Sequence, residues 1–260
     1  KTQGQFPMPF GSNIYLYLDL YFEDENSVRK AIEEAKYLNQ KLKNNLLIVR
    51  ITRPTTVQIM DLIKSELKYF PSINLVIDYS NKGFAKIIKE DSRKNNIGMI
   101  MLTSEMFKNK ENTKSVMELK IPVFKFGKEK LKSIKRTVIV LNDTNSYEQI
   151  SPIVFDISSQ LKVKTKIFDL DPIGEKDGKS TLLDHFENLA KIFNEKLEVV
   201  TSGENPIREL KKQRNMLQIL PLKDEMFKKR FSFKFLYTNS DFIAFDMNKF
   251  NQLLIPIVEE

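Results

Sequence analysis

Short runs of apolar residues alternate with segments of helical period along the first half of the chain. Between the first two runs, apolar side chains recur every three or four residues, which predicts a helix with one buried face. These side chains are Val28, Ala31, Ile32, Ala35, Leu38 and Leu42. Similar patterns predict helices within 54–70, 82–94 and 108–119. The runs themselves have the length of strands and cover residues 13–22, 45–52, 73–80, 97–103 and 121–127.

The second half of the chain repeats this order. The helix after its first strand places Ile150, Val154 and Ile157 on one side, and Pro152 predicts that this helix begins at Ser151. Two more helices are predicted, within 182–193 and 205–213. The predicted strands of this half cover residues 136–143, 163–171, 197–203, 216–222 and 251–258.

Strands that alternate with helices indicate an α/β fold, which we predict as two tandem doubly wound parallel sheets of five strands each. Continuous apolar strands fit sheets that are covered on both faces. The basic stretch between Lys125 and Lys135 has no apolar period and is predicted to be a linker. We therefore expect two α/β domains, residues 1–128 and 129–260.

A loop in the second half ends in Gly178-Lys179-Ser180, as a phosphate-binding P-loop does. A P-loop needs four residues between its first glycine and this tripeptide. Gly174 and Gly178 enclose only three, and two of the three are acidic. Because acidic side chains repel phosphate, we interpret this segment as a solvated loop whose Ser180 caps the next helix. A nucleotide-using enzyme acting at residues 174–181 stays as an alternative.

The composition limits the class of protein to which this chain can belong. A content of 41% hydrophobic and 29% charged residues is typical of a soluble globular chain. The absence of cysteine excludes disulfides and thiolate metal sites, and fits a reducing compartment. The sequence has no apolar run of about 18 residues and no signal-peptide pattern. Because it begins at Lys1, we expect a processed chain or a piece of a longer one.

Positive charge is concentrated in two segments of this chain, whose formal net charge is +8. Segment 108–136 has ten Lys/Arg against three Asp/Glu, and segment 208–230 has eight against three. This basic band can contact an anionic membrane surface, and a solvated lysine-rich face is the simpler interpretation. Nucleic acid is not an expected partner, because no known nucleic-acid motif accompanies the charges.

Residues that carry chemistry are few. His185 is the one histidine, and without cysteine it gives no zinc constellation. No Gly-x-Ser-x-Gly, Gly-x-Gly-x-x-Gly or calcium-loop pattern occurs. No catalytic residue and no metal site is therefore predicted, and the chain is not expected to be an enzyme.

The tandem pattern resembles the universal stress protein family, whose fold is adenine nucleotide α-hydrolase-like. Residues 137–161, "TVIVLNDTNSYEQISPIVFDISSQL", are similar to the family's opening strand, aspartate-containing turn and first helix. Residues 251–258, "NQLLIPIV", and 121–126, "IPVFKF", are similar to its closing strand. The resemblance covers nearly the whole chain as a tandem pair, and it implies this fold for both copies.

Nucleotide-binding members of that family carry a glycine-rich signature after the fourth strand, where backbone amides contact ribose and phosphates. Residues 101–116 and 220–240 take this place in the two copies, and neither segment contains a glycine. Side chains then stand where phosphate would need close approach to the backbone. No nucleotide is therefore expected as a cofactor.

Polar residues at the carboxyl ends of the predicted strands are the candidates for a ligand site, because doubly wound sheets bind ligands there. Asp143 stands where the family has its turn aspartate. The alternative for each candidate is a structural role, in which its side chain caps the following helix or shapes the turn. The candidates are Asp143, Thr144, Ser146, Asp78, Ser80, Thr103 and Ser104.

Degenerate tandem domains of this fold occur as cytoplasmic parts of membrane transporters, and the chain resembles such a part. The resemblance implies a non-catalytic module that regulates or assembles a cation/proton antiporter or a cotransporter, on the cytoplasmic side of an inner membrane. It implies a homodimer along the closing strands and a contact of the basic band with the membrane domain or anionic lipid. A free-standing tandem universal stress protein that binds a nucleotide or a partner protein in the cytoplasm is the alternative.

Overall fold

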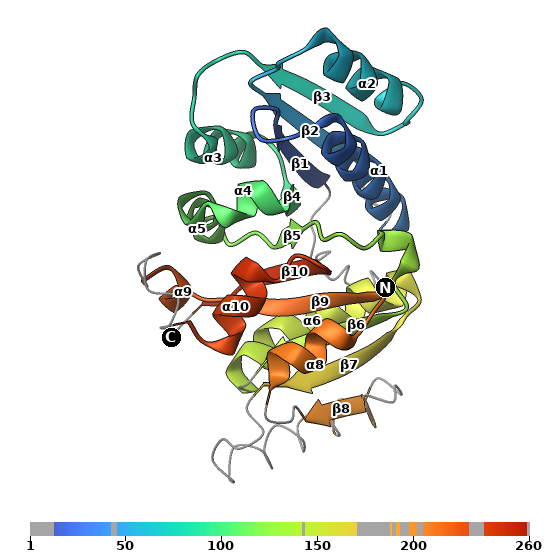
Figure 1. The fold of residues 1–260 in the computed structure, drawn as a ribbon, viewed down its shortest axis with the longest axis vertical. Coiled ribbons are helices and arrows are strands. Elements are labelled where there is room, and N and C mark those ends of the chain that lie inside the picture. The colour runs from blue at the N-terminus through green and yellow to red at the C-terminus, as the bar shows by residue number, and fades with distance from the viewer. Residues whose placement is uncertain are drawn as a thin grey trace, which may run out of the picture. The chain divides into compact units, whose positions relative to one another are not determined.

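The computed structural model describes residues 13–42, 46–141, 144–170, 188, 191–192, 198–201, 205–228 and 237–258. The chain divides into two compact units, Lys1–Gly127, called unit 1, and Lys128–Glu260, called unit 2. Both units are built of parallel strands and helices, which Figure 1 labels. The α/β class with parallel strands is therefore confirmed.

In the described residues of unit 1, neighbouring strands pair in parallel and follow the order β3-β2-β1-β4-β5. The order reverses between β1 and β4. Ligands of doubly wound sheets bind at the carboxyl ends of the strands near such a reversal. The strands are β1 (Asn13–Asp19), β2 (Leu46–Thr52), β3 (Ile73–Asp78), β4 (Ile97–Leu102) and β5 (Val123–Lys125).

The helices of unit 1 begin where a side chain or a glycine ends the extended backbone. Asp24, Thr56, Thr103 and Asn109 each accept a hydrogen bond from a backbone N–H of the helix that follows, whereas Gly83 begins α3 without a side-chain cap. Figure 1 shows α1 and α2 on one face of the strands and α3 and α5 on the other. The helices are α1 (Glu25–Lys41), α2 (Val57–Leu67), α3 (Phe84–Lys94), α4 (Ser104–Lys108) and α5 (Lys110–Glu118).

Unit 2 repeats the strand order of unit 1. Where the structure describes it, the parallel order is β10-β9-β6-β7-β8, which again runs fifth, fourth, first, second and third. The strands are β6 (Arg136–Leu141), β7 (Lys164–Asp169), β8 (Glu198–Thr201), β9 (Met216–Leu222) and β10 (Asn251–Pro256). The helices are α6 (Thr144–Leu161), α8 (Pro206–Lys212), α9 (Glu225–Lys228) and α10 (Asn239–Asp246), with a short 3-10 helix η1 (Leu131–Ser133).

The predicted strands are confirmed in both units, with ends that differ by a few residues. The buried face predicted for the first helix is also confirmed, because all six of its apolar residues are buried. The helices α4, α9 and α10 were not predicted. In α10, Ile243, Ala244 and Phe245 are buried in succession, so no polar face marks the helix in the sequence.

The predicted start of α6 at Ser151 was wrong. The helix begins at Thr144, and Pro152 lies inside it. Proline has no N–H to donate to the carbonyl four residues earlier, which here belongs to Glu148. The Ser151 hydroxyl lies 3.4 Å from that carbonyl oxygen and donates to it instead. Tyr147, which precedes the proline by more than a turn, is fully buried, so packing holds the first turns in place.

The stretch predicted as a linker is also more ordered than expected. Lys125 ends β5, and Leu131 lies in η1; both side chains are buried. The Lys125 Nζ lies 5.1 Å from the centre of the Phe107 ring, so its apolar stem and its charge are both accommodated in unit 1. The Gly178-Lys179-Ser180 loop and His185 lie outside the described residues.

A ring of three buried hydroxyls joins the strands of unit 2 to α6. Ser158 of α6 lies 2.7 Å from Thr137 of β6 and 3.0 Å from Thr165 of β7, and the two threonines are 3.1 Å apart. Two buried glutamines form a second neutral contact, in which Gln252 donates to Gln218 at 2.8 Å across β10 and β9. Unit 2 therefore joins these elements through neutral buried groups.

Candidate functional site

A cleft of ≈ 400 Å³ opens in unit 1 at the carboxyl ends of β1, β2 and β3. Tyr17 and Asp19 of β1 and Thr52 of β2 line it, as does Arg53 directly after β2. The segment 80–84, which leads into α3, and polar residues of the α4–α5 region complete the lining. Small-molecule sites have volumes of about 300–1,000 Å³, so this cleft has the size and the place of a ligand site.

Asp19 and Arg53 form a two-pronged ion pair at this cleft. The Asp19 carboxylate accepts from Arg53 Nε at 2.9 Å and from Nη2 at 2.6 Å. It also accepts from the backbone N–H of Tyr21 at 3.1 Å. The carboxylate is thus largely occupied by protein donors, whereas the five N–H groups of a guanidinium exceed the two that Arg53 uses here.

The backbone and the side chain of Arg53 are both held in a special position. Its φ of 48° is in the left-handed region, which a residue other than glycine adopts at a cost. Its guanidinium carbon lies 4.4 Å from the ring centre of Tyr21 and 5.1 Å from that of Phe22. Both rings are exposed, and Phe22 lines the cleft. The guanidinium is therefore fixed in orientation by an ion pair and two aromatic contacts.

Two hydroxyls lie at the buried end of the cleft. Thr52 Oγ1 donates to Tyr17 Oη at 3.2 Å, and both side chains are almost fully buried. Burial raises the pKa of Tyr17, because the phenolate is poorly solvated there, so the phenol keeps its proton. In the described part of the chain, Tyr17 makes this one hydrogen bond. Its own proton can therefore be donated to a ligand.

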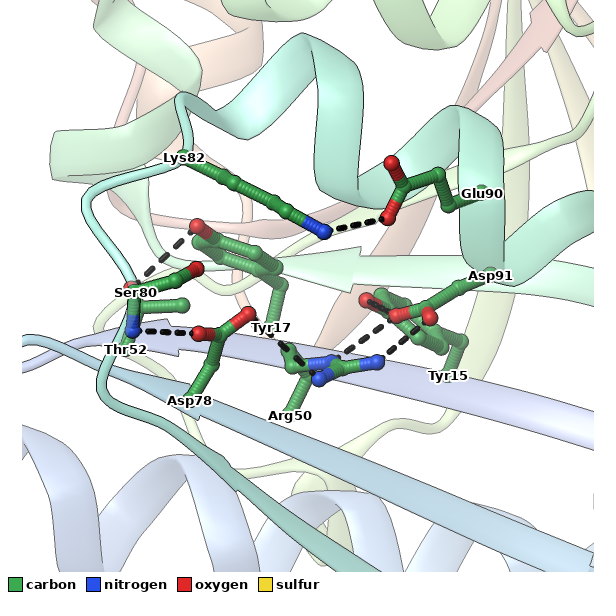
Figure 2. Close-up of polar contacts among 9 residues, drawn as sticks. All are labelled: Tyr15, Tyr17, Arg50, Thr52, Asp78, Ser80, Lys82, Glu90 and Asp91. Carbon is green, nitrogen blue, oxygen red and sulfur yellow. Dashed lines mark hydrogen bonds and ion pairs between the residues drawn. The ribbon is translucent and has the colours of Figure 1, made fainter.

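The loop from β3 to α3 forms one wall of the cleft, and Asp78 fixes its start (Figure 2). Asp78 Oδ1 accepts from the Ser80 backbone N–H at 2.7 Å, and hydrogen bonding from Ser80 lowers the pKa of Asp78. Lys82, further along the loop, lies 3.1 Å from Glu90 of α3, and both side chains are partly exposed. Lys82 is therefore tethered by a weak surface ion pair.

Behind this loop, a charged network ties the strands to α3 (Figure 2). Arg50 of β2 donates to Asp91 of α3 from Nε at 2.9 Å and from Nη2 at 2.5 Å. Tyr15 of β1 donates to the same carboxylate at 2.5 Å. Arg50 Nη1 also lies 3.6 Å from Asp78 Oδ2. The network thus runs from the core of unit 1 to the loop that lines the cleft.

The carboxyl end of β4 is acidic, and the polar side chain of Thr103 there already has hydrogen-bond partners. Thr103 begins α4, accepts from the Met106 N–H and donates to the buried carboxyl of Glu23. Burial raises the pKa of Glu23, and the neighbouring carboxylates of Glu105 and Asp24 act in the same direction. The hydrogen bond from Thr103 offsets part of this shift. This edge of the sheet therefore disfavours an anion.

The structure places the predicted site residues in different environments. Ser80 lines the cleft, and Asp78 lies behind it. Thr103 caps α4 and Ser104 is its first residue; neither lines the cleft. In unit 2, Thr144 is the first residue of α6 and Ser146 is buried two residues later. Asp143 lies outside the described residues.

The sequence reasoning missed Tyr17, Asp19, Arg53 and Lys82. A signal for two of them was present. Asp19 interrupts the apolar run 13–22, and Arg53 follows the second run immediately before Pro54. The predicted first strand extended past Asp19, which hid the fact that this residue ends it.

No group of three His, Cys, Asp or Glu side chains that could hold a metal ion occurs within the described ranges. No helix among those residues is long and apolar enough to cross a membrane. In the basic segment 108–136, Lys110 and Lys125 are buried, so that segment does not form a uniformly exposed basic face.

No protein-family model and no curated protein matches this sequence. Among solved structures, a functionally unknown protein from Pseudomonas aeruginosa PAO1 is 11% identical with a TM-score of 0.65, over 95% of this chain and 93% of that one. A universal stress protein from Archaeoglobus fulgidus DSM 4304 is 13% identical with a TM-score of 0.60, over 94% of this chain and 97% of that one. At these identities the likeness shows the fold alone, and that fold is universal stress protein-like.

Proposed function

We propose that this chain is a non-catalytic sensor module, in which unit 1 binds a small polar molecule and thereby controls a partner protein. The cleft of unit 1 carries this proposal. It lies at the carboxyl ends of parallel strands, where doubly wound folds bind ligands, and it brings hydroxyl, amide and charged side chains together. Asp78 links its wall to the charged network of the core, so a change in the cleft has a path into unit 1.

In the form of this proposal that follows from the family resemblance, the partner is a membrane transporter. The chain is then its cytoplasmic regulatory or assembly part and acts as a homodimer. The basic segments 108–136 and 208–230 support this form, since clustered Lys and Arg are attracted to anionic lipid. The universal stress protein-like fold supports a free-standing cytoplasmic protein equally well.

Vesicle sedimentation distinguishes these two forms. The transporter form predicts that the chain pellets with phosphatidylserine vesicles at low salt, and that it stays in solution with phosphatidylcholine vesicles or at high salt. A chain that stays in solution under all these conditions would favour the free-standing form.

The sensor function itself is tested by ligand binding to the purified chain. A ligand that binds the folded state alone raises the melting temperature by mass action. The panel is ATP, AMP, adenosine, cyclic dinucleotides, small organic acids, amines and alcohols, and monovalent cations, each followed by calorimetric titration. We expect at least one of these small molecules to bind; no shift with any of them would contradict the proposal.

The variant Gly83→Leu tests whether the ligand binds in the cleft. A Cβ built on Gly83 meets no heavy atom within 4 Å, and its φ of −70° suits any residue, so leucine fits the backbone and fills the cleft. We expect this variant to keep its stability and lose the ligand. Ala85→Leu is the matched control, because Ala85 is exposed on the same helix and is not part of the cleft lining. Unchanged binding by Gly83→Leu would place the ligand elsewhere.

A further inference from the structure

The lining of the cleft in unit 1 contains more cationic than anionic side chains. The lining includes one carboxylate, Asp19, and two cations, Arg53 and Lys82. The Asp19 carboxylate is occupied by two prongs of Arg53 and by the Tyr21 N–H. A cationic ligand would therefore find no unoccupied carboxylate in the lining, whereas an anion would meet two cations, one paired with Asp19 and the other with Glu90, which lies outside the lining.

Arg53 is prepared to bind an anion. It donates two of its five N–H groups to Asp19, and no other hydrogen bond of its side chain occurs in the described part of unit 1. Its guanidinium is held by Tyr21 and Phe22, so little side-chain entropy remains to be lost on binding. Its left-handed backbone is the kind of strained conformation that persists at ligand sites.

Lys82 is available to an anion because its ion pair in the protein is weak. Its ion pair with Glu90 is 3.1 Å long, and 43% of the lysine side chain and 36% of the glutamate side chain are exposed. An exposed pair of this kind contributes about 0–1 kcal/mol, so a ligand anion can replace Glu90 as the partner of Lys82. Lys82 lines the cleft, so the ligand anion would then neutralise its positive charge.

The buried end of the cleft supplies a neutral donor. The phenolic proton of Tyr17 has no acceptor among the described residues, and the hydroxyl is almost fully buried. A buried hydroxyl without an acceptor costs free energy, and a ligand oxygen would remove that cost. The end of β4 offers no comparable donor, because Thr103 already donates to Glu23.

We propose, building on the proposed sensor function, that the cleft selects a small organic anion whose charged group binds Arg53 and Lys82 and whose oxygen accepts the Tyr17 proton. The anion is thus held at the ends of β2 and β3, not by the segment after β4. Phe22, Phe84 and Met106 give the cleft apolar surface for an uncharged part of the ligand. Phosphate esters and carboxylates share this chemistry.

Calorimetric titration with matched probes tests the selectivity. Phenyl phosphate and benzoate represent the two anion types, and benzamide and benzylamine are the neutral and cationic analogues. We expect one or both anions to bind at least tenfold more tightly than either analogue, and the anion affinity to fall as salt is raised. Comparable affinities for all four probes, or no binding of either anion, would overturn the proposal.

Two substitutions that break the same ion pair separate a binding role of Lys82 from a structural one. Lys82→Met removes the charge and keeps the stem, so anion affinity should fall about tenfold or more. Glu90→Gln removes the competing carboxylate and leaves the lysine, so anion affinity should be unchanged or higher. If both variants weaken binding alike, Lys82 acts only through its ion pair and the assignment is wrong.

The two proposals fail in different ways. A neutral or cationic molecule that binds the wild-type chain and is lost in Gly83→Leu would keep the sensor function and overturn the anion selectivity. An anion that binds Gly83→Leu and wild type with equal affinity would show that the cleft is not the binding site, which would contradict both proposals.

Discussion

The two units stabilise buried polar groups by different means. Unit 1 joins β1, β2 and α3 through charges, with Arg50 and Tyr15 both donating to Asp91. Unit 2 joins β6, β7 and α6 through the hydroxyls of Thr137, Thr165 and Ser158. Both sets of groups tie a helix to adjacent strands of a parallel sheet. One set carries charge and the other does not.

This difference bears on where a ligand can bind. The hydroxyl ring of unit 2 is closed, because each oxygen contacts the other two and no donor is left over. The network of unit 1 is open: Arg50 reaches Asp78, Asp78 holds the Ser80 N–H, and Ser80 lines the cleft. An open network extends from the core to the surface, so the binding proposed for the cleft of unit 1 can affect the packing of that unit.

The largest expected effect comes from breaking the charged network. Asp91→Ala leaves the partly buried Arg50 guanidinium and the buried Tyr15 hydroxyl without their carboxylate; loss of one partner from a buried pair typically costs about 3–5 kcal/mol. Urea denaturation followed by circular dichroism measures the loss. The control is Glu90→Ala on the same helix, which removes a partly exposed pair and should cost less than about 1 kcal/mol. Equal losses in the two variants would mean that the buried network is no more important than a surface pair.

A smaller effect is expected from the neutral ring. Ser158→Ala removes two hydrogen bonds but leaves the one between Thr137 and Thr165, so we expect a loss of about 1–2 kcal/mol. None of the three hydroxyls titrates near neutral pH, and the loss should be the same at pH 5 and pH 8. The exposed neighbour Ser159→Ala is the control and should change stability by less than about 0.5 kcal/mol. A loss at Ser158 as large as that at Asp91 would remove the contrast between the units.

The smallest effect concerns Glu23, whose pKa is raised by burial. A carboxyl with a folded-state pKa above its unfolded value stabilises the fold below the unfolded value, near 4.5, and this contribution is lost as the pH rises through the folded value. Glu23→Gln keeps an acceptor for Thr103 and does not titrate. Its stability relative to wild type should therefore increase from pH 4 to pH 7, by less than about 1 kcal/mol.

Urea denaturation at several pH values measures this difference. Glu33→Gln, at an exposed position of α1, should show no comparable trend and serves as the control. If Glu23→Gln became less stable relative to wild type as the pH rose, the carboxylate form would be the favoured one and the sign of the pKa shift would be wrong.

The sequence by itself determined the order of the strands and of the longer helices, although the short helices α4, α9 and α10 were not predicted. Apolar runs and helical period are local properties, and in this chain they marked strands from β1 to β10 within a few residues. The start of α6 is an exception, because tertiary packing overrides a local signal there. The position of Pro152 suggested a helix start, and only the packing of Tyr147 and the hydrogen bond from Ser151 show that the helix continues through it.

Only the tertiary structure decided which polar residues meet. Asp78 and Ser80 could be named from strand ends, because those positions are predictable from the strand pattern. Asp19 lies at the end of β1 and pairs with Arg53, which follows β2. Lys82, from the loop after β3, lines the same cleft. Such contacts depend on strand order and on the path of each loop, which no local pattern encodes. The sequence therefore predicted the edge of the sheet at which the cleft lies, and the folded chain selected the residues that line it.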